Sequence, residues 1–259
     1  MEEIKSLRHR VLAGECVVGT FYKLNSPLAT EILGIAGFDF IVVDREHSAI
    51  DYGATEDIIR TAKGVGLATV VRIPSSLEEH VFHALDSGAD GVQIPNITSV
   101  SQAEESVRCA KYSPEGCRGL SRTTRAARYG AWDNEIPYVK YANDNSLVVV
   151  HIENKEMAEQ VEAICQIPQI DVVFVGPADM SQSLGIPGQS NDPRVVEIAS
   201  RVIATARRYG KAGGINVTNE AGLKQYIDMG ATYITYNADT GMLMSGAKNI
   251  VKQFSSYKK

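Results

Sequence analysis

The chain has 259 residues, 44% of them hydrophobic, and carries a net charge of −5 at pH 7. This length is typical of one α/β barrel, and the apolar content is sufficient for a large core. The acidic balance argues against a nucleic acid or an anionic membrane surface as a partner, because both bind basic surfaces.

The sequence also bears on the compartment in which the protein works. No apolar run approaches the roughly 20 residues that cross a membrane, and the charged stretch after Met1 lacks the apolar core of a signal peptide. Cys16, Cys109, Cys117 and Cys165 are far apart and form no C-x-x-C pair, which indicates reduced thiols rather than disulfides or a zinc site. We therefore expect a cytoplasmic protein without membrane contacts.

Apolar, strand-like runs alternate with helical patterns from one end of the chain to the other. The predicted strands are residues 16–21, 38–43, 68–71, 91–94, 147–152, 171–175, 212–215 and 233–236. The predicted helices are residues 27–33, 54–63, 77–85, 100–111, 138–143, 156–164, 193–209, 220–229 and 243–254. Eight strand–helix units in this length predict a (β/α)₈ TIM barrel that forms a single domain over residues 1–259.

A doubly wound open sheet is the alternative to the barrel. It is disfavoured because no G-x-G-x-x-G sequence follows the first strand. The alternating rhythm breaks only at residues 113–137, which are rich in Gly, Arg and polar side chains. A long loop inside a compact domain is usually functional or part of an interface.

Polar residues follow nearly every predicted strand. They are Asp44, Glu46, His47, Arg72, Gln93, Asn96, Glu153, Asp179, Asn216, Asn237 and Asp239. Any one of them is explained equally well as a helix cap or a turn residue. In a barrel, however, the carboxyl ends of all strands meet on one face, so the whole set predicts a shared site.

Two of these residues have the chemistry of metal ligands. Glu153 and Asp179 follow neighbouring strands, and two carboxylates with open remaining positions suit a hard divalent ion such as Mg²⁺ or Mn²⁺. A pair of helix caps, or an ion pair with a basic residue, is the alternative interpretation.

The polar residues after the second and third strands have the chemistry of a base and an anion-binding group. His47 follows Glu46 and lies three residues after Asp44, and a carboxylate can hold a histidine in one tautomer and raise its basicity. Arg72 is a natural partner for a substrate carboxylate or oxyanion. The alternatives are a lone surface histidine and a salt bridge from Arg72 to Asp44, Glu46 or Asp86.

The sequence Gly176–Pro177–Ala178–Asp179 forms a tight turn directly after a buried strand. Its backbone N–H groups, apart from the missing one of Pro177, can point at an anion. Beside a divalent ion, such a turn would bind the carboxylate of a 2-oxo acid, and the ion would stabilise the corresponding enolate.

Six segments of the chain resemble the HpcH/HpaI aldolases, which are metal-dependent class II pyruvate aldolases. They are FDFIVVDREHSAID, VVRIP, ALDSGADGVQIP, CRG, VVHIENKEM and VFVGPADMSQSLG, in the order found in that family. The resemblance runs from about Gly19 to the last helix. It implies a barrel whose last helix is swapped between subunits, in dimers that assemble into hexamers. It also implies a divalent metal, Mg²⁺ or Mn²⁺ with Co²⁺ or Zn²⁺ as further candidates.

The resemblance also assigns roles to individual residues. It implies that Glu153 and Asp179 hold the metal, and that pyruvate enolate binds this metal with its carboxylate on Gly176–Asp179. It implies that His47, paired with Asp44, is the base and acts through a metal-bound water. Arg72 would polarise the keto oxygen. Asp86 matches an acid near the aldehyde entry, contributed across a subunit contact.

The chain departs from the family pattern at three places. His151 stands where many members have Gln, and it would add a metal ligand, alter the pKa of bound water or fill space; we group it with the substrate-binding residues. Arg45 stands where many have Gly, and it would bind an acidic substrate tail or a neighbouring subunit. Residues 236–239 replace a more usual Val-Gly-x-Asp. These changes leave the aldehyde partner open.

Residues and resemblance together predict an aldolase that cleaves a 4-hydroxy-2-oxo acid into pyruvate and an aldehyde. The first alternative is a related lyase on the same enolate, such as an oxaloacetate decarboxylase or a malyl- or citramalyl-CoA lyase. A CoA lyase needs a basic surface, and the only compact basic cluster is Arg118, Arg122, Arg125 and Arg128. The second alternative is a non-catalytic protein that binds oxo acids.

Overall fold

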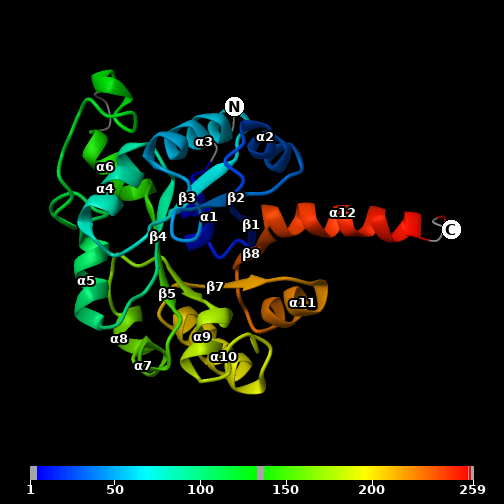
Figure 1. The fold of residues 1–259 in the computed structure, drawn as a ribbon. Coiled ribbons are helices and arrows are strands. Elements are labelled where there is room, and N and C mark those ends of the chain that lie inside the picture. Colours follow the sequence, from blue (N-terminus) through cyan, green and yellow to red (C-terminus); the bar gives the residue numbers. More distant parts are fainter. Residues whose placement is uncertain (1–4, 133–136, 256, 258–259) are drawn as a thin grey trace.

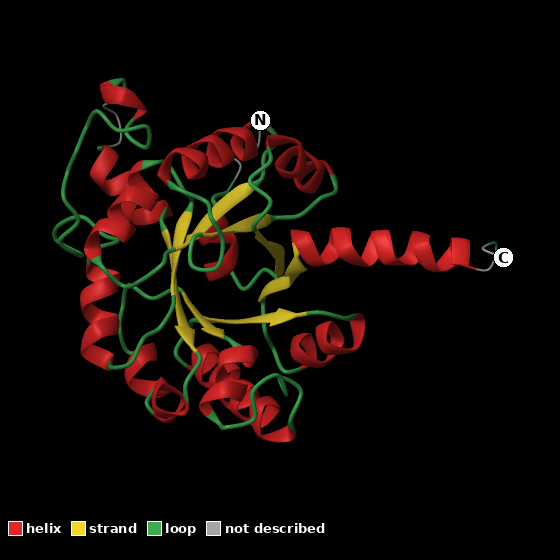
Figure 2. Ribbon diagram, in the orientation of Figure 1, coloured by secondary structure: helices red, strands yellow, loops and turns green. Residues whose placement is uncertain are grey.

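The computed structural model describes residues 5–132, 137–255 and 257, and its eight parallel strands close into a barrel surrounded by helices (Figures 1 and 2). The strands are β1 (Val17–Tyr22), β2 (Phe40–Asp44), β3 (Ala68–Arg72), β4 (Gly91–Ile94), β5 (Leu147–Ile152), β6 (Val172–Val175), β7 (Ala212–Val217) and β8 (Tyr233–Ala238). The (β/α)₈ prediction is confirmed. The open doubly wound alternative is wrong, because β1 pairs in parallel with β8 and closes the sheet.

Helices alternate with the strands, and all but the first and the last pack around the outside of the barrel. They are α1 (Leu7–Leu12), α2 (Pro27–Ile35), α3 (Tyr52–Gly64), α4 (Glu78–Asp86), α5 (Val100–Arg108), α6 (Tyr138–Asn145), α7 (Lys155–Glu159), α8 (Val161–Cys165), α9 (Pro177–Ser183), α10 (Pro193–Arg208), α11 (Glu220–Asp228) and α12 (Asp239–Ser255), with a 3₁₀ turn η1 (Arg128–Gly130). The sequence did not predict α1 or α9, and the helix expected at 156–164 is divided into α7 and α8. None of the helices in the described part of the chain is long and apolar enough to cross a membrane.

The barrel interior is filled by an apolar layer that forms a floor beneath the strand ends. Phe40 and Tyr233 stack with their ring centroids 4.5 Å apart, and Phe174 meets Tyr233 edge-on at 6.1 Å. Gly19 makes this packing possible, because a Cβ atom there would lie 2.4 Å from the Phe40 ring. A second and larger apolar cluster fills the space between the strands and the surrounding helices.

Helix α1 covers the amino-terminal end of the barrel. Its side chains Leu7 and Val11 are buried in the same cluster as the interior rings. Arg8 fixes the helix in place, because its Nε atom donates to both carboxylate oxygens of Asp171 at 3.0 Å. These contacts attach α1 to the amino-terminal end of the barrel, opposite the carboxyl ends of the strands. A six-residue helix is too short to give a clear periodic pattern, which explains why the sequence did not reveal it.

Helix α12 projects away from the barrel instead of packing along it (Figure 1). Several of its large apolar side chains are exposed: Leu243, Met244, Ile250, Val251 and Phe254. Helix α2 exposes Leu28, Ile32 and Ile35 in the same way. Exposed apolar surfaces of this kind usually mark protein–protein contacts.

Candidate active site

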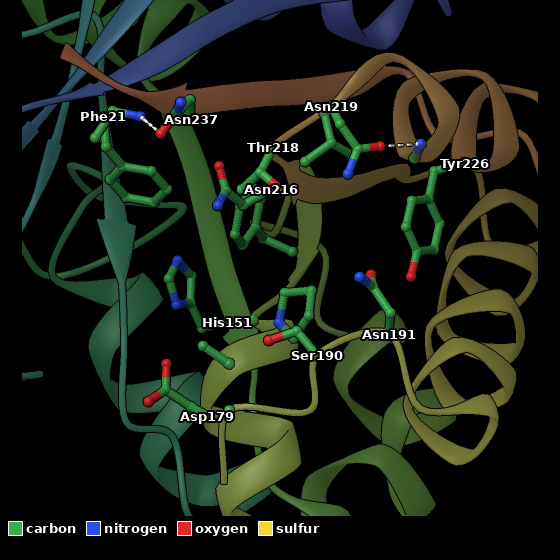
Figure 3. A pocket seen from close by; sticks show the side chains of 18 of the residues that line it. Phe21, His151, Asp179, Ser190, Asn191, Asn216, Thr218, Asn219, Tyr226 and Asn237 are labelled. Carbon is green, nitrogen blue, oxygen red and sulfur yellow. Dashed lines mark hydrogen bonds between the residues drawn. The ribbon is translucent and has the colours of Figure 1, made fainter. Parts of the chain in front are cut away.

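A cavity of about 740 Å³ opens at the carboxyl-terminal ends of the strands. The predicted site residues that line it are His47, Arg72, His151, Gly176, Pro177, Ala178 and Asp179. Figure 3 shows His151 and Asp179 beside the same open space. Two further predicted residues, Asp44 and Glu153, are buried and contact lining residues from below. The structure therefore brings all the predicted site residues together except Asp86.

Asp44 and Arg72 form a buried ion pair because they occupy matching positions on the neighbouring strands β2 and β3. The Nε and Nη2 atoms of Arg72 donate to the two oxygens of Asp44 at 2.9 and 2.7 Å. Lys23 lies 3.1 Å from the same carboxylate. Burial acts to raise the pKa of Asp44, but the hydrogen bonds and charge of Arg72 outweigh it and hold this pKa below its ordinary value. Asp44 is therefore ionised and fixes the guanidinium plane of Arg72.

The third nitrogen of Arg72 is held by another acid. Its Nη1 atom lies 3.0 Å from Glu46, and the guanidinium also packs over the Phe21 ring at 4.6 Å. Glu46 in turn accepts a hydrogen bond of 2.6 Å from the side chain of Asn96. Arg72 is thus held on several sides, and one face of it borders the cavity.

His47 lies at the rim of the cavity with its side chain 56% exposed. The expected pairing with Asp44 exists, but it runs through the backbone: the N–H of His47 donates to Asp44 at 3.1 Å. The imidazole instead lies closest to Glu46, at 3.8 Å. The expected contact between the Asp44 carboxylate and the imidazole is therefore wrong, because Arg72 and backbone N–H groups occupy that carboxylate. The exposed ring remains accessible to a substrate.

Glu153 belongs to a chain of buried hydrogen bonds that crosses the barrel. Its Oε2 atom accepts from Nδ1 of His151 at 2.9 Å, and Nε2 of His151 lies 2.6 Å from the amide nitrogen of Gln93. Gln93 Oε1 accepts from the Tyr233 hydroxyl at 3.4 Å, so we assign the Gln93 amide as the donor to His151. His151 also stacks on Phe174 with centroids 4.8 Å apart. This arrangement fixes both the imidazole and the carboxylate.

The second oxygen of Glu153 is fixed by the loop after β4. The backbone N–H of Asn96 donates to Glu153 Oε1 at 2.5 Å. Asn96 has a φ of 58°, a left-handed conformation that asparagine tolerates better than most residues. Burial acts to raise the pKa of Glu153, but its interactions with His151 and the Asn96 N–H dominate and lower it. Glu153 is therefore held as a carboxylate.

Glu153 and Asp179 approach each other around Gly176. A Cβ atom on Gly176 would lie 3.2 Å from Glu153 Oε2 and 3.7 Å from Asp179 Oδ2, so both oxygens flank one small space that a side chain would fill. In the described part of the chain, no group of three or more His, Cys, Asp or Glu side chains is spaced to hold a metal ion. Two carboxylates nevertheless fit a hard divalent ion that completes its ligands with water and substrate.

The predicted turn at Gly176–Asp179 is the beginning of helix α9. Gly176 is its N-cap residue and Pro177 occupies the first helical position, where a missing N–H costs nothing. Asp179 therefore lies in the first turn, beside the positive end of the helix dipole. The helix was missed in the sequence because Gly and Pro together indicate a turn.

Comparison with known proteins places the chain among carbon–carbon lyases. Residues 18–246 match the HpcH/HpaI aldolase/citrate lyase family. The chain belongs to this family. It is 33% identical over 242 residues to the 5-keto-4-deoxy-D-glucarate aldolase of Enterobacter sp. (strain 638), which covers 93% of both chains.

Solved structures agree with this assignment. An HpcH/HpaI aldolase/citrate lyase family protein from Burkholderia cenocepacia J2315 has a TM-score of 0.90 and 32% identity, and covers 96% of this chain and 98% of its own. The citrate synthase SbnG has a TM-score of 0.85 and 27% identity, and covers 97% and 99%. The chain is accordingly an aldolase-type lyase, and aldolases of the HpcH/HpaI family generally depend on a divalent metal.

Asp86 is the predicted residue that does not reach the cavity of this HpcH/HpaI chain. It is the last residue of α4, which follows β3 and runs back toward the amino-terminal end of the barrel. Its carboxylate accepts from Arg118 at 2.5 Å. An aldehyde-binding role for Asp86 therefore requires another subunit, as the resemblance implied.

Sequence reasoning missed two residues near the site. Lys23 was overlooked because the first strand was expected to end at residue 21, whereas β1 ends at Tyr22 and delivers Lys23 beside Asp44. Tyr226 lines the cavity from α11 and was not singled out, because it lies within a predicted helix and not directly after a strand. Arg45 lies over the Tyr52 ring at 3.7 Å and donates to a backbone carbonyl; contact with an acidic substrate tail or a neighbouring subunit stays a prediction.

Proposed function

We propose that this protein is a divalent-metal-dependent aldolase that reversibly cleaves a 4-hydroxy-2-oxo acid to pyruvate and an aldehyde. The observation that carries the proposal is the meeting of two carboxylates, Glu153 and Asp179, around Gly176 in the cavity that Arg72 and His47 also line. The aldolases among the relatives support the same reaction class.

The residues that line the cavity have separate roles in this reaction. Arg72, held in one plane by Asp44, presents its positive charge to the oxygen that becomes negative during cleavage. His47, exposed at the rim, takes the proton of the 4-hydroxyl group. The C3–C4 bond then breaks, C4 leaves as an aldehyde, and its bonding electrons form the enolate of pyruvate. Protonation at C3 completes the reaction.

Glu153 and Asp179 are the residues that would hold the metal, and Mg²⁺ or Mn²⁺ suits their oxygens best, with Co²⁺ or Zn²⁺ as further candidates. When bound, the ion supplies positive charge that favours the enolate over the ketone. The first turn of α9 offers the N–H groups of Ala178 and Asp179 to the carboxylate of the oxo acid, since Pro177 has no N–H and that of Gly176 donates to the Ile152 carbonyl. His151 keeps Glu153 in position from below.

Aldol cleavage assayed with and without a chelator tests the proposal. We expect full loss of pyruvate release after metal removal and recovery on adding Mg²⁺ or Mn²⁺. Asp179→Asn should weaken binding of Mn²⁺ in a calorimetric titration, whereas Asp192→Asn, at a cavity carboxylate tied to Arg194, should not. Activity that persists after complete metal removal would exclude this mechanism.

A second reaction of the same enolate is favoured by the likeness to the citrate synthase SbnG. Oxaloacetate is the substrate to test, both for decarboxylation and for condensation. The CoA-lyase alternative finds less support, because Arg118, Arg125 and Arg128 line a separate cleft and not this cavity. Calorimetry with CoA distinguishes the CoA lyase from the aldolase.

We further propose a single-domain subunit spanning residues 1–259 that forms a cytoplasmic homo-oligomer, a trimer of dimers in which α12 is swapped between subunits. The exposed apolar side chains of α12 and α2 support this assembly. The four free cysteines fit a reducing compartment. Light scattering on the wild type and on Ile250→Glu, a charge in the exposed face of α12, tests the assembly.

A further inference from the structure

The cavity extends well beyond the proposed reaction centre, and the wall of this extension is polar. One side comes from the loop between α9 and α10, and the other from the end of β7 and the start of α11. We call this part the polar arm; its residues are Ser190, Asn191, Asn216, Thr218, Asn219 and Tyr226. Figure 3 shows these six side chains around the open space, with Tyr226 and Asn191 on the side away from Phe21.

Tyr226 is the most informative residue of the polar arm. The residue is only 4% exposed, yet its hydroxyl forms no hydrogen bond with any other described residue. In Figure 3 the hydroxyl points toward Asn191 across the cavity. The ring is buried, but the hydroxyl oxygen reaches the cavity, where a ligand or an ordered water can pair with it. Burial raises the pKa of Tyr226, so the hydroxyl keeps its proton and can donate.

Two amides in the polar arm are oriented by the fold so that their NH₂ groups remain available. Asn219 is the N-cap of α11, and its Oδ1 atom accepts from the Gly222 N–H at 2.8 Å. Asn216 Oδ1 accepts from the buried Thr235 hydroxyl at 3.0 Å. With the oxygens occupied in this way, both amides present donors to the cavity.

The polar arm is also uncharged. Among the described residues that line the cavity, the Lys and Arg side chains are Lys23 and Arg72, which lie outside the arm and both pair with Asp44. The acid nearest to the arm in sequence, Asp192, is neutralised by Arg194 at 2.8 Å. Neutral groups that both donate and accept match hydroxyl groups. A carboxylate would lie in the arm without a cation beside it, and an apolar chain cannot replace the hydrogen bonds of the displaced water.

We propose that the polar arm binds hydroxyl groups on the aldehyde-derived half of the substrate, so that the preferred aldehydes carry hydroxyls at carbons 2 and 3. This inference rests on the proposed aldolase function and specifies its substrate class. A site built to hydrogen-bond a hydroxyl discriminates strongly against an analogue that lacks it, because the groups of the site are then left unpaired.

The test is aldol addition of pyruvate to matched aldehydes: D-glyceraldehyde against propanal, and D-erythrose against butanal. We expect kcat/KM to favour the hydroxylated member of each pair by at least about tenfold. Equal rates, a preference for the deoxy aldehydes, or a preference for a carboxylated aldehyde of the same length would overturn the inference.

Two conservative variants assign the preference to the polar arm. Tyr226→Phe removes one hydroxyl group, and Thr218→Val replaces one by a methyl group. Each should reduce the ratio of kcat/KM for glyceraldehyde to kcat/KM for propanal by about 3- to 10-fold. Tyr209→Phe, the same change outside the cavity, should leave the ratio unaltered. Thr218 is exposed, so Thr218→Val remains informative if Tyr226→Phe fails to fold. Ratios unchanged in both folded variants would refute the assignment.

Exchange of the pyruvate methyl protons with D₂O, followed by NMR, separates this inference from the proposed function. The exchange requires enolate formation but no aldehyde. Exchange without a preference for hydroxylated aldehydes would refute the polar arm and leave the aldolase intact. Absence of both exchange and turnover would refute the proposed function, and the inference would fail with it.

Discussion

Replacing Asp44 by Asn is the sharpest test of how the site is held together. Asp44 is fully buried, and its carboxylate pairs with Arg72 through two hydrogen bonds of 2.9 and 2.7 Å. It also contacts Lys23 and accepts from the backbone N–H groups of Glu46 and His47. Asn keeps one oxygen for the backbone donors but removes the more buried of the two carboxylates that pair with the guanidinium.

The expected cost follows from this geometry. Removing one partner of a buried ion pair typically destabilises by about 3–5 kcal/mol. We expect the lower end, about 3 kcal/mol, because Arg72 keeps Glu46 at 3.0 Å and Asn preserves the backbone contacts. For a chain of this size that corresponds to a decrease in Tm of about 6–12 °C. Pyruvate release should fall as well, because the guanidinium loses its fixed orientation.

Urea unfolding at one fixed protein concentration measures the change in free energy. Glu56→Gln is the matched control: Glu56 forms an exposed pair with Arg60 at 2.7 Å and should change stability by less than about 1 kcal/mol. A loss below about 1 kcal/mol for Asp44→Asn, equal to the control, would show that the buried pair does not organise the site.

The same substitution makes a prediction about pH. The pKa of Asp44 in the folded protein lies below its ordinary value, so the carboxylate stabilises the fold above the unfolded pKa of about 3.9. This contribution disappears as the pH falls from there through the folded pKa. The stability difference between wild type and Asp44→Asn should therefore be constant near neutral pH and shrink below about pH 4.

Four further outcomes are expected. His47→Asn should reduce kcat by about 10²- to 10⁴-fold while Mn²⁺ affinity, measured by calorimetry, stays unchanged. His151→Phe preserves the ring stack but removes the hydrogen bond to Glu153, so Mn²⁺ affinity should fall by about 10- to 100-fold, and His151→Gln should restore part of it. Lys111 is buried, which lowers its pKa to about 8; because it binds its proton more weakly in the folded state, wild-type stability should rise relative to Lys111→Met by up to about 1.4 kcal/mol per pH unit between about pH 8 and 10 in urea titrations. Mixed oligomers of inactive Asp86→Asn and inactive His47→Asn subunits should regain activity if Asp86 acts across a subunit contact, and unmixed oligomers should not.

The elements of the barrel could be predicted because strands buried on both faces leave long apolar runs in the sequence. Residues 147–152, for example, are expected and found as a strand with the same bounds. Prediction failed where an element was short or began with a turn signal. Helix α1 has six residues, and α9 begins directly after Gly176 at Pro177, so neither gave a periodic pattern.

The membership of the site could be predicted, but its internal connections could not. Residues after parallel strands meet at one end of a barrel whatever the register, so Asp44 and Arg72 were expected near each other. A salt bridge from Arg72 to Asp44, Glu46 or Asp86 was one alternative, and the register of β2 against β3, which the sequence does not reveal, pairs Arg72 with Asp44. The imidazole of His47 was therefore assigned a partner that another residue already occupies.

The link between His151 and Gln93 depends on a different property of the fold. These residues are 58 positions apart and meet only because both side chains point into the closed barrel from neighbouring strands. The link continues to Tyr233 in the apolar floor, where that ring stacks on Phe40. Packing in the floor therefore determines where the Glu153 carboxylate lies. A substitution that weakens the packing of the floor should therefore disturb metal binding although it replaces no metal ligand. The packed barrel interior thus helps to position the active site.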